Sequence, residues 1–478
     1  MDTMEPATPD IASLGDSSVT TRLEDQEPIR ADASRGTEKQ SQAATDTTLP
    51  VPSSPIYAPT QADLTKHRRR WIPRISSRLR NTLLSTMGLL ELANAGDFAA
   101  NVWNEIPVPI YAIVFMALGG TLALVVSILA LKDTLLSWQN VCFLRNERSA
   151  LKAERLERLQ RSLPTLDVDV LLDTNFRELG SEIANRFGLD ICSGFGAFLI
   201  SIGTYMAIGG ANRQAWFASN ILSGYLGNAP IALYGLISSG WSAYIFRRAS
   251  QHRGIAAQLP RLQGSRAVKA IERRTRNVHI YTLVSAVSSV IGGGASMVTA
   301  TRWEGYVVLI PVILSSMFYN SWLRRNVAYD RPPAGDSLHL TEDAITHELE
   351  VAEMTWREIR GQSRPLREVV ADATSLEAVT TYLVANDLLE HFCLSLMKST
   401  VVAPVLVSQE STDVTIDAKR LLEMPKEIHP TMIEIANETI KQKGPKHFEY
   451  RQRYLAEILG STLRLSLKAG CGGSMTEC

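Results

Sequence analysis

Five long stretches without Asp, Glu, Lys or Arg most constrain what this chain can fold into. A helix needs about 20 apolar residues to cross the hydrocarbon core of a bilayer, and an uncharged run of 18 or more is a candidate span. The sequence therefore predicts an all-α membrane protein with a helical transmembrane bundle of five clear spans. They lie at residues 106–131, 191–212, 222–246, 278–301 and 306–323.

Averages over the 478 residues conceal this division, because the formal net charge of zero combines apolar blocks with strongly charged segments. The five cysteines are scattered and odd in number. Such a pattern indicates neither a disulfide framework nor a zinc site, and a reducing compartment fits it best. The sequence contains no glycine-rich phosphate loop, so we expect no cofactor, and we expect no nucleic-acid partner either.

The amino-terminal segment, residues 1–65, carries eleven acidic and four basic side chains and is rich in Ser, Thr, Pro and Ala. It cannot bury enough apolar surface to offset the entropy of ordering, so we expect a disordered acidic tail. It also lacks the basic start and short apolar core of a signal peptide. We therefore expect the spans themselves to direct insertion.

A basic run follows this tail, because residues 66–80 hold seven Lys or Arg and no acid. The run predicts contact with anionic lipid headgroups, to which each basic residue contributes roughly 1 kcal/mol. An ordinary solvated charge run is the alternative interpretation.

The segment 66–104 also contains a weaker membrane signal. Between residues 83 and 103, four polar side chains recur every three or four positions and form one stripe on a helix. They are Glu91, Asn94, Asp97 and Asn101. This helix can lie in the membrane interface, or it can cross as a sixth span with its stripe toward the bundle. Each acid at mid-bilayer costs about 2.5–3.5 kcal/mol, so five crossings are the expected count.

The distribution of Lys and Arg predicts the orientation, because these residues are retained on the cytoplasmic side. The loop 247–277 contains nine basic residues and one acid, so it is expected in the cytosol. The segment 132–189 and everything after residue 323 then also face the cytosol. Five crossings place the amino-terminal end outside, which the basic run at 66–80 argues against.

Three aspartates in the segment 132–189 are the best candidates for a metal site. Asp167, Asp169 and Asp173 are spaced so that carboxylates can hold a divalent cation against a phosphate. No second acidic motif on another cytosolic segment completes such a site. The same residues open an amphipathic helix, and acids are stabilised in the first turn of a helix. We therefore expect them to be residues of a helix start.

The fourth span carries a pattern typical of helix packing. Ser288, Gly292 and Ser296 recur every four residues, and small residues so spaced let two helix backbones approach closely in a membrane. A pore or a substrate site at a helix break around residues 292–294 is the alternative.

Two other residues in the spans bear on function. His279 is the one ionisable side chain within the five spans, and it lies at the cytosolic edge. Because ion relays use residues at depth, this composition argues against an ion-coupled transporter. Pro230 is expected to kink the third span.

The carboxyl-terminal region, residues 337–468, is long enough for one small helical domain in the cytosol, and residues 469–478 indicate a flexible tail. Apolar spacing predicts four helices in this domain. One is capped by Thr341, one runs from a capping box at Thr374 to Leu396, one opens at Pro430, and one covers residues 446–468.

Three short features of this domain allow two interpretations each. Residues 400–407 are rich in β-branched side chains and predict a strand or a buried loop. His391 is interpreted as the partner of a nearby acid and Cys393 as a buried thiol. A metal pair is the alternative for these two, but no further ligands lie at a suitable spacing.

Residues 190–325 combine uncharged glycine-rich spans, a basic central loop and the closing run from Tyr306 to Leu323. In these features the chain resembles a group of multi-pass integral membrane proteins of filamentous fungi to which no activity is assigned. The resemblance implies a membrane location and nothing about chemistry.

Three classes of function are compatible with these patterns. Long cytosolic helices without a catalytic motif favour a non-enzymatic membrane scaffold or interaction protein that binds a protein partner. A transporter or channel for a small solute would use the kinked third span and residues 292–294. A metal-dependent membrane enzyme would use Asp167 and Asp169.

Overall fold

The computed structural model describes residues 61–67, 70–73, 97–103, 107–329, 341–407 and 412–472, and all of them belong to one compact unit. The described chain is mostly helical. Five helical stretches are long and apolar enough to cross a membrane by length and composition, and each overlaps one of the five predicted spans. They are Ile110–Gln160, Leu166–Ala207, Arg213–Gln258, Arg266–Val298 and Glu304–Leu323.

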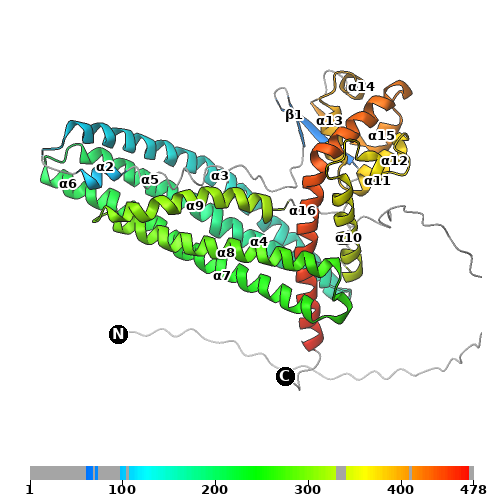
Figure 1. The fold of residues 1–478 in the computed structure, drawn as a ribbon, viewed down its shortest axis with the longest axis horizontal. Coiled ribbons are helices and arrows are strands. Elements are labelled where there is room, and N and C mark those ends of the chain that lie inside the picture. Colours follow the sequence, from blue (N-terminus) through cyan, green and yellow to red (C-terminus); the bar gives the residue numbers. More distant parts are fainter. Residues whose placement is uncertain are drawn as a thin grey trace, which may run out of the picture. The chain divides into compact units, whose positions relative to one another are not determined.

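The bundle is built from α3 (Ile110–Gln160), α5 (Gly188–Ala207), α7 (Ala229–Gln258), α8 (Arg266–Val298) and α9 (Glu304–Asn326). α3 packs against α5, α7 against α8, and α8 against α9, so these helices lie side by side (Figure 1). Large apolar side chains cover the outward-facing positions, and Leu118, Leu236 and Phe318 are 61%, 65% and 78% exposed. An exposed apolar surface of this size is typical of a face that contacts a membrane or another protein.

Small side chains occupy the positions where the helices meet. A Cβ atom on Gly293 of α8 would lie 2.9 Å from Cα of Ala232 on α7, and one on Gly235 of α7 would clash with the backbone of Ser289. Glycine is therefore required for this approach of the two backbones. α8 is continuous through residues 292–294, so the helix break considered there is absent.

Two π-helical stretches connect the helices of the bundle. α4 (Leu166–Ser181) continues through η2 (Glu182–Phe187) into α5, and α6 (Arg213–Ser219) continues into η3 (Asn220–Leu226). α7 starts three residues later with Pro230 in its first turn, where a missing amide hydrogen costs nothing. The Asn228 side chain donates to the carbonyls of Ser223 and Gly224, at 3.3 and 2.9 Å. The predicted kink at Pro230 is thus a break between two helices.

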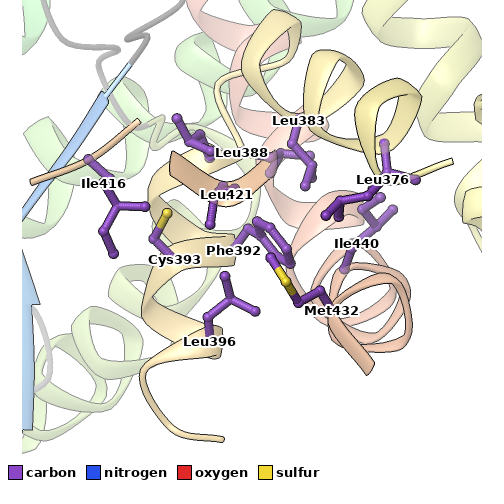
Figure 2. Close-up of a cluster of buried hydrophobic side chains, with 14 of the residues drawn as sticks. Leu376, Leu383, Leu388, Phe392, Cys393, Leu396, Ile416, Leu421, Met432 and Ile440 are labelled. Carbon is purple, nitrogen blue, oxygen red and sulfur yellow. The ribbon is translucent and has the colours of Figure 1, made fainter. Parts of the chain in front are cut away.

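The carboxyl-terminal domain has a continuous apolar core (Figure 2). Phe392, Leu383, Met432 and Ile440 are fully buried in it and come from three different helices. The helices of this domain are α10 (Glu342–Ile359), α11 (Leu366–Val369), α12 (Leu376–Ala385), α13 (Leu389–Leu396), α14 (Ala403–Leu406), α15 (Ala418–Leu422), η5 (Lys426–Ile428) and α16 (His429–Gly472).

A three-stranded antiparallel sheet belongs to the same domain, with strand order β2-β1-β3. β1 (Gln61–His67) and β2 (Arg70–Pro73) form a hairpin, and β1 pairs with β3 (Asp413–Asp417) so that Leu64 faces Val414. Ala62 and Leu64 are buried in the domain core. The carboxyl-terminal domain is therefore completed by residues from the amino-terminal part of the chain.

This hairpin corrects two predictions. Residues 61–65, placed in the disordered tail, form a strand because every second side chain is apolar and finds a core to enter. The start of the basic run 66–80 lies in β1 and β2 and is part of a sheet. Residues 1–60, for which disorder is expected, and residues 74–80 lie outside the described part of the chain.

The helix boundaries of the domain differ in part from the predicted ones. Thr341 caps α10 as predicted, but the cap of α12 is Ser375, one residue after Thr374. The single helix predicted to reach Leu396 is split, because Asp387 adopts φ 54°, a left-handed conformation that aspartate tolerates. Residues 403–406 form a short helix, α14, where a strand or loop was predicted.

α16 joins two helices that the sequence separated. It runs without interruption from His429 to Gly472, with Pro445 inside it, and takes in the first residues of the predicted flexible tail. Its first half packs in the domain core through Met432 and Phe448. Its second half, drawn in red in Figure 1, leaves that core and packs on α4, α7 and α8 of the bundle.

Candidate functional site

The second half of α16 buries a charged side chain against the bundle. Glu457 is 5% exposed and faces one arginine from each of three helices. Its carboxylate lies 3.5 Å from Arg177 of α4, 3.3 Å from Arg248 of α7 and 2.9 Å from Arg274 of α8. We refer to Glu457, its three arginines and the ionic groups that touch them as the Glu457 cluster.

A second carboxylate extends the Glu457 cluster. Asp173 of α4 lies 2.8 Å from Arg248 and also pairs with Arg464, about two turns further along α16 than Glu457. The Ser461 hydroxyl accepts a 2.8 Å hydrogen bond from Arg248. Three positions of α16 therefore bind charged groups of the bundle.

Tyr329, which follows α9, closes the cluster from another side. Its ring lies 5.2 Å from the guanidinium of Arg177 and 5.1 Å from that of Arg274, distances typical of cation–π contacts. Its hydroxyl accepts from Arg177 and donates to Glu178 at 2.8 Å. The cluster thus ties α4, α8 and the chain after α9 to α16.

The electrostatics of Glu457 follow from this setting. Burial alone would raise the pKa of its carboxyl, but the guanidinium groups of Arg177, Arg274 and Arg248 outweigh burial and hold the pKa well below its usual range. Glu457 is therefore ionised in the folded protein. Removing one partner of a buried ion pair leaves an uncompensated charge and costs about 3–5 kcal/mol.

The Glu457 cluster has the features of a clamp and lacks those of a catalytic site. Its cavity measures about 10 Å³, which holds about one water molecule. Its carboxylates are held by arginines, which have no accessible neutral form to exchange protons. Among the described residues, no group of three or more His, Cys, Asp or Glu is placed to hold a metal ion.

The three aspartates considered as metal ligands have separate partners. Asp167 and Asp169 lie in the first turn of α4. Asp167 pairs with Arg158 at 2.7 Å and Asp169 with Arg155 at 2.5 Å, both on α3. Asp173 faces away into the Glu457 cluster. The structure thus brings each carboxylate to an arginine and not to one another.

The predicted packing stripe of the fourth span lies on α8. Ser296 is buried and its hydroxyl donates to the Gly293 carbonyl at 2.9 Å. A Cβ on Gly292 would lie 3.1 Å from a methyl group of Val312 on α9, and Ser288 is half-buried. Of these three residues, Gly292 lies at a contact between α8 and α9, whereas the Ser296 hydrogen bond is internal to α8.

Two buried carboxylates lie just outside the ends of the predicted spans. Asp133 and Asp190 are 2% and 3% exposed, and the Ser137 hydroxyl donates to Asp190 at 3.0 Å. Neither carboxylate lies within a predicted span, because the first span ends at residue 131 and the second begins at residue 191. The absence of acids within the five spans therefore does not exclude buried carboxylates beside them.

Another buried acid lies at the far end of the bundle. Asp97 precedes α2 (Phe98–Val102) and is fully buried. The Tyr306 hydroxyl donates to it at 2.8 Å, and the Asn101 amide donates to it at 2.9 Å. These two members of the predicted polar stripe therefore face the bundle; Glu91 and Asn94 lie outside the described residues.

The histidine and thiol candidates have ordinary surroundings. His279 shares a 2.9 Å hydrogen bond with Ser250 and stacks on Phe246. Cys393 is fully buried among apolar residues, which raises the pKa of its thiol, as expected for an inert buried cysteine. His391 lies beside His447, with ring centroids 6.3 Å apart.

The Glu457 cluster was not predicted from the sequence. Arg248 and Arg274 were used only as topology signals in the basic loop, and Glu457 stood in a helix with many other charges. One signal was available, since Glu457 is the one charged residue between Tyr454 and Leu463 of α16. No protein-family model, curated protein or solved structure matches this chain.

Proposed function

We propose that this chain is a multi-pass integral membrane protein that acts as a non-enzymatic scaffold, holding its carboxyl-terminal domain in a fixed position against one end of the bundle. The observation that carries this proposal is the burial of Glu457 among arginines from three bundle helices. A domain tethered by a loop would not need such a contact.

The way α16 packs supports a fixed position. Its residues Met432 and Phe448 belong to the core of the domain, whereas Leu455 and Leu459 belong to a second core shared with Ile271 of α8. Because one continuous helix packs in both cores, it holds the carboxyl-terminal domain in a fixed position relative to the bundle. The ionic cluster then fixes the rotation of this helix.

The positions of α2 and α16 support a specific topology. Arg274 of α8 contacts α16, and Ala295 near the other end of α8 lies in a cluster with Phe98 and Tyr306. At 1.5 Å per residue these two points of one continuous helix are about 30 Å apart, the thickness of a bilayer core. α2 and α16 thus mark opposite faces of the proposed membrane.

This placement changes the number of crossings. The hairpin ending at Pro73 pairs with β3 of the carboxyl-terminal domain and so lies on the side of α16, whereas Asp97 lies on the other side. Pro73 and Asp97 therefore lie on opposite faces of the proposed membrane. We propose six crossings, with both ends of the chain on one side, in place of the expected five.

Six crossings also remove a conflict in the charge pattern. The basic run 66–80 and the basic loop 247–277 now lie on one side, and the positive-inside rule makes that side cytosolic. The carboxyl-terminal domain is then cytosolic. Contact of the basic run with anionic lipid headgroups remains compatible with this placement.

Three measurements test the scaffold. Spin labels at Glu272→Cys on α8 and Glu377→Cys on α12, both exposed positions, should give one narrow distance distribution in nanodiscs. A broad distribution would show a mobile domain and contradict the proposal. Purified protein in sealed vesicles should also show no solute flux, and cross-linking in native membranes should map a protein partner to residues 341–472.

A transporter is the second candidate, because Asp133 and Asp190 are buried close to the end of two spans. Asp190→Asn would abolish an ion-coupled flux while keeping the hydrogen-bonding shape of the side chain. Gly293→Leu, the obvious test of the glycine-rich region, is unsuitable, since a side chain there meets the backbone of Ala232. A solute flux that depends on Asp190 would show that the protein is a transporter and would contradict the scaffold proposal.

A further inference from the structure

A second cavity shares Arg274 with the Glu457 cluster. It is a cleft of about 260 Å³ between α8, α10, α16 and the end of α9. The cavity beside Glu457 is about 10 Å³ in volume. The cleft, unlike that cavity, has room for a small ligand.

Basic side chains dominate the lining of the cleft. Its two acids are each paired with an arginine one turn away, Glu353 with Arg357 and Glu449 with Arg453. Arg453 also donates a 2.8 Å hydrogen bond to the carbonyl of Ala328, which follows α9, so its guanidinium already has partners within the protein. The basic residues of the lining are Arg266, Lys269, Arg273, Arg274, Arg357 and Arg453.

Three of these basic residues form a row on α8. Arg266, Lys269 and Arg273 are exposed and lie three and four positions apart, which places them on one face of the helix. Within the described part of the chain, no ion pair or side-chain hydrogen bond engages them. The cleft therefore carries an uncompensated positive charge.

Arg274 adds a buried donor to this row. Its Nε donates to Glu457 at 2.9 Å, but its Nη1 and Nη2 are buried and have no hydrogen-bond partner among the described residues. Unpaired buried donors are costly, and the fork of a guanidinium matches the oxygens of a phosphate. Arg274 lines the cleft, and an acceptor with two oxygens is the kind of partner that its two nitrogens lack.

We propose that this cleft binds a phosphate-bearing anion, supplied as the phosphorylated headgroup of an anionic membrane lipid. Asn277 and Asn326 line the cleft, and they lie next to the predicted spans 278–301 and 306–323. A lipid beside α8 and α9 would thus bring its headgroup to the cleft. The lipid source rests on the proposed membrane placement, whereas the phosphate chemistry does not.

The test compares two triple variants of the full-length protein. Arg266→Gln, Lys269→Gln and Arg273→Gln remove the exposed row of the cleft. The matched control, Arg247→Gln, Arg253→Gln and Arg276→Gln, removes the same charge from exposed positions of the same basic loop outside the cleft. Equal melting temperatures of both variants and the wild type would show that folding is preserved.

Two binding experiments distinguish a requirement for phosphate from a requirement for a lipid that carries the phosphate. In nanodiscs of phosphatidylcholine alone, titration with inositol trisphosphate and with inorganic phosphate tests the cleft without any lipid ligand. In vesicles containing phosphatidylinositol bisphosphate, native mass spectrometry after extraction measures the lipid retained by the protein. We expect binding in both arms, and a loss of about tenfold or more in the cleft variant but not in the control.

Three outcomes would revise or overturn the proposed phosphate site. Binding of the soluble phosphates without retention of the lipid would keep the phosphate site and reject the lipid source, and it would leave the proposed membrane placement untouched. An equal loss in both triple variants would show unspecific attraction by the basic loop and overturn the site. Absence of binding in both arms would overturn it as well.

Discussion

Glu457 on α16 accepts a 2.9 Å hydrogen bond from Nε of Arg274 on α8, a residue 183 positions earlier in the chain. This contact joins the carboxyl-terminal domain to the bundle, and it is one of three ion pairs that the same carboxylate makes. The stability of the whole assembly should therefore respond to this side chain.

Glu457→Gln should destabilise the protein by about 3–5 kcal/mol, because it leaves buried arginines without their counter-charge. Glu434→Gln, at an exposed position of the same helix, is the matched control and should change stability by no more than about 0.5 kcal/mol. Thermal unfolding in detergent measures both. Equal melting temperatures for the two variants would rule out the clamp.

The same carboxylate predicts how stability depends on pH. The folded pKa of Glu457 lies well below its unfolded value of 4.5, so its contribution is fully present above about pH 5 and is lost as the pH falls through the folded value. Wild type should therefore lose stability relative to Glu457→Gln as the pH is lowered below 4.5. A constant difference between the two proteins over that range would contradict the assigned pKa.

Two neighbouring glycines on α8 provide a test of the packing. Gly293→Ala should destabilise the bundle by about 1–3 kcal/mol, because the new methyl group would lie 2.9 Å from Cα of Ala232. Gly294→Ala meets nothing within 4 Å and should be neutral or slightly stabilising. Melting temperatures in detergent distinguish the two. Similar effects at both positions would mean that α7 and α8 do not pack closely there.

The hairpin gives a parallel test of the carboxyl-terminal domain. Leu64 is fully buried in the domain core, so Leu64→Ala should cost about 2–5 kcal/mol. Ile72 of β2 is 45% exposed, and Ile72→Ala should have little effect. Protease resistance of the domain is a suitable readout. If Leu64→Ala leaves it unchanged, the hairpin is not part of the domain.

The sequence predicted the elements that depend on local patterns. The five apolar stretches were recognised because a span is a continuous signal. The start of α10 was recognised because the Thr341 cap is a pattern of neighbouring residues.

The features that were missed depend on contacts distant in sequence. β1 has only seven residues and pairs with a strand about 350 positions later, so local composition placed part of it in the acidic tail. The role of Glu457 depends on three helices that lie far from it in the chain. Position in the fold, and not residue type, distinguishes Glu457 from the exposed Glu434 on the same helix.

The side of the membrane on which Asn437 lies is a further prediction. Asn437, Glu438 and Thr439 form the one glycosylation sequon of the chain. A cytosolic domain never meets the luminal transferase, so Asn437 should stay unmodified after expression in microsomes. A sequon engineered in a lengthened loop beside Arg213 should be modified. A glycosidase-sensitive band shift at Asn437 in the native chain would place the domain in the lumen.

The most direct test of the central claim is the side of the membrane on which each end of the chain lies. An epitope inserted before residue 61 and another after residue 472, in otherwise intact protein in sealed vesicles, can be probed with protease from outside. Because β1 pairs with β3, both epitopes should lie on the same side, opposite to the loop beside Arg213. Epitopes on opposite sides would mean an odd number of crossings, and would contradict both the shared sheet and the clamped domain.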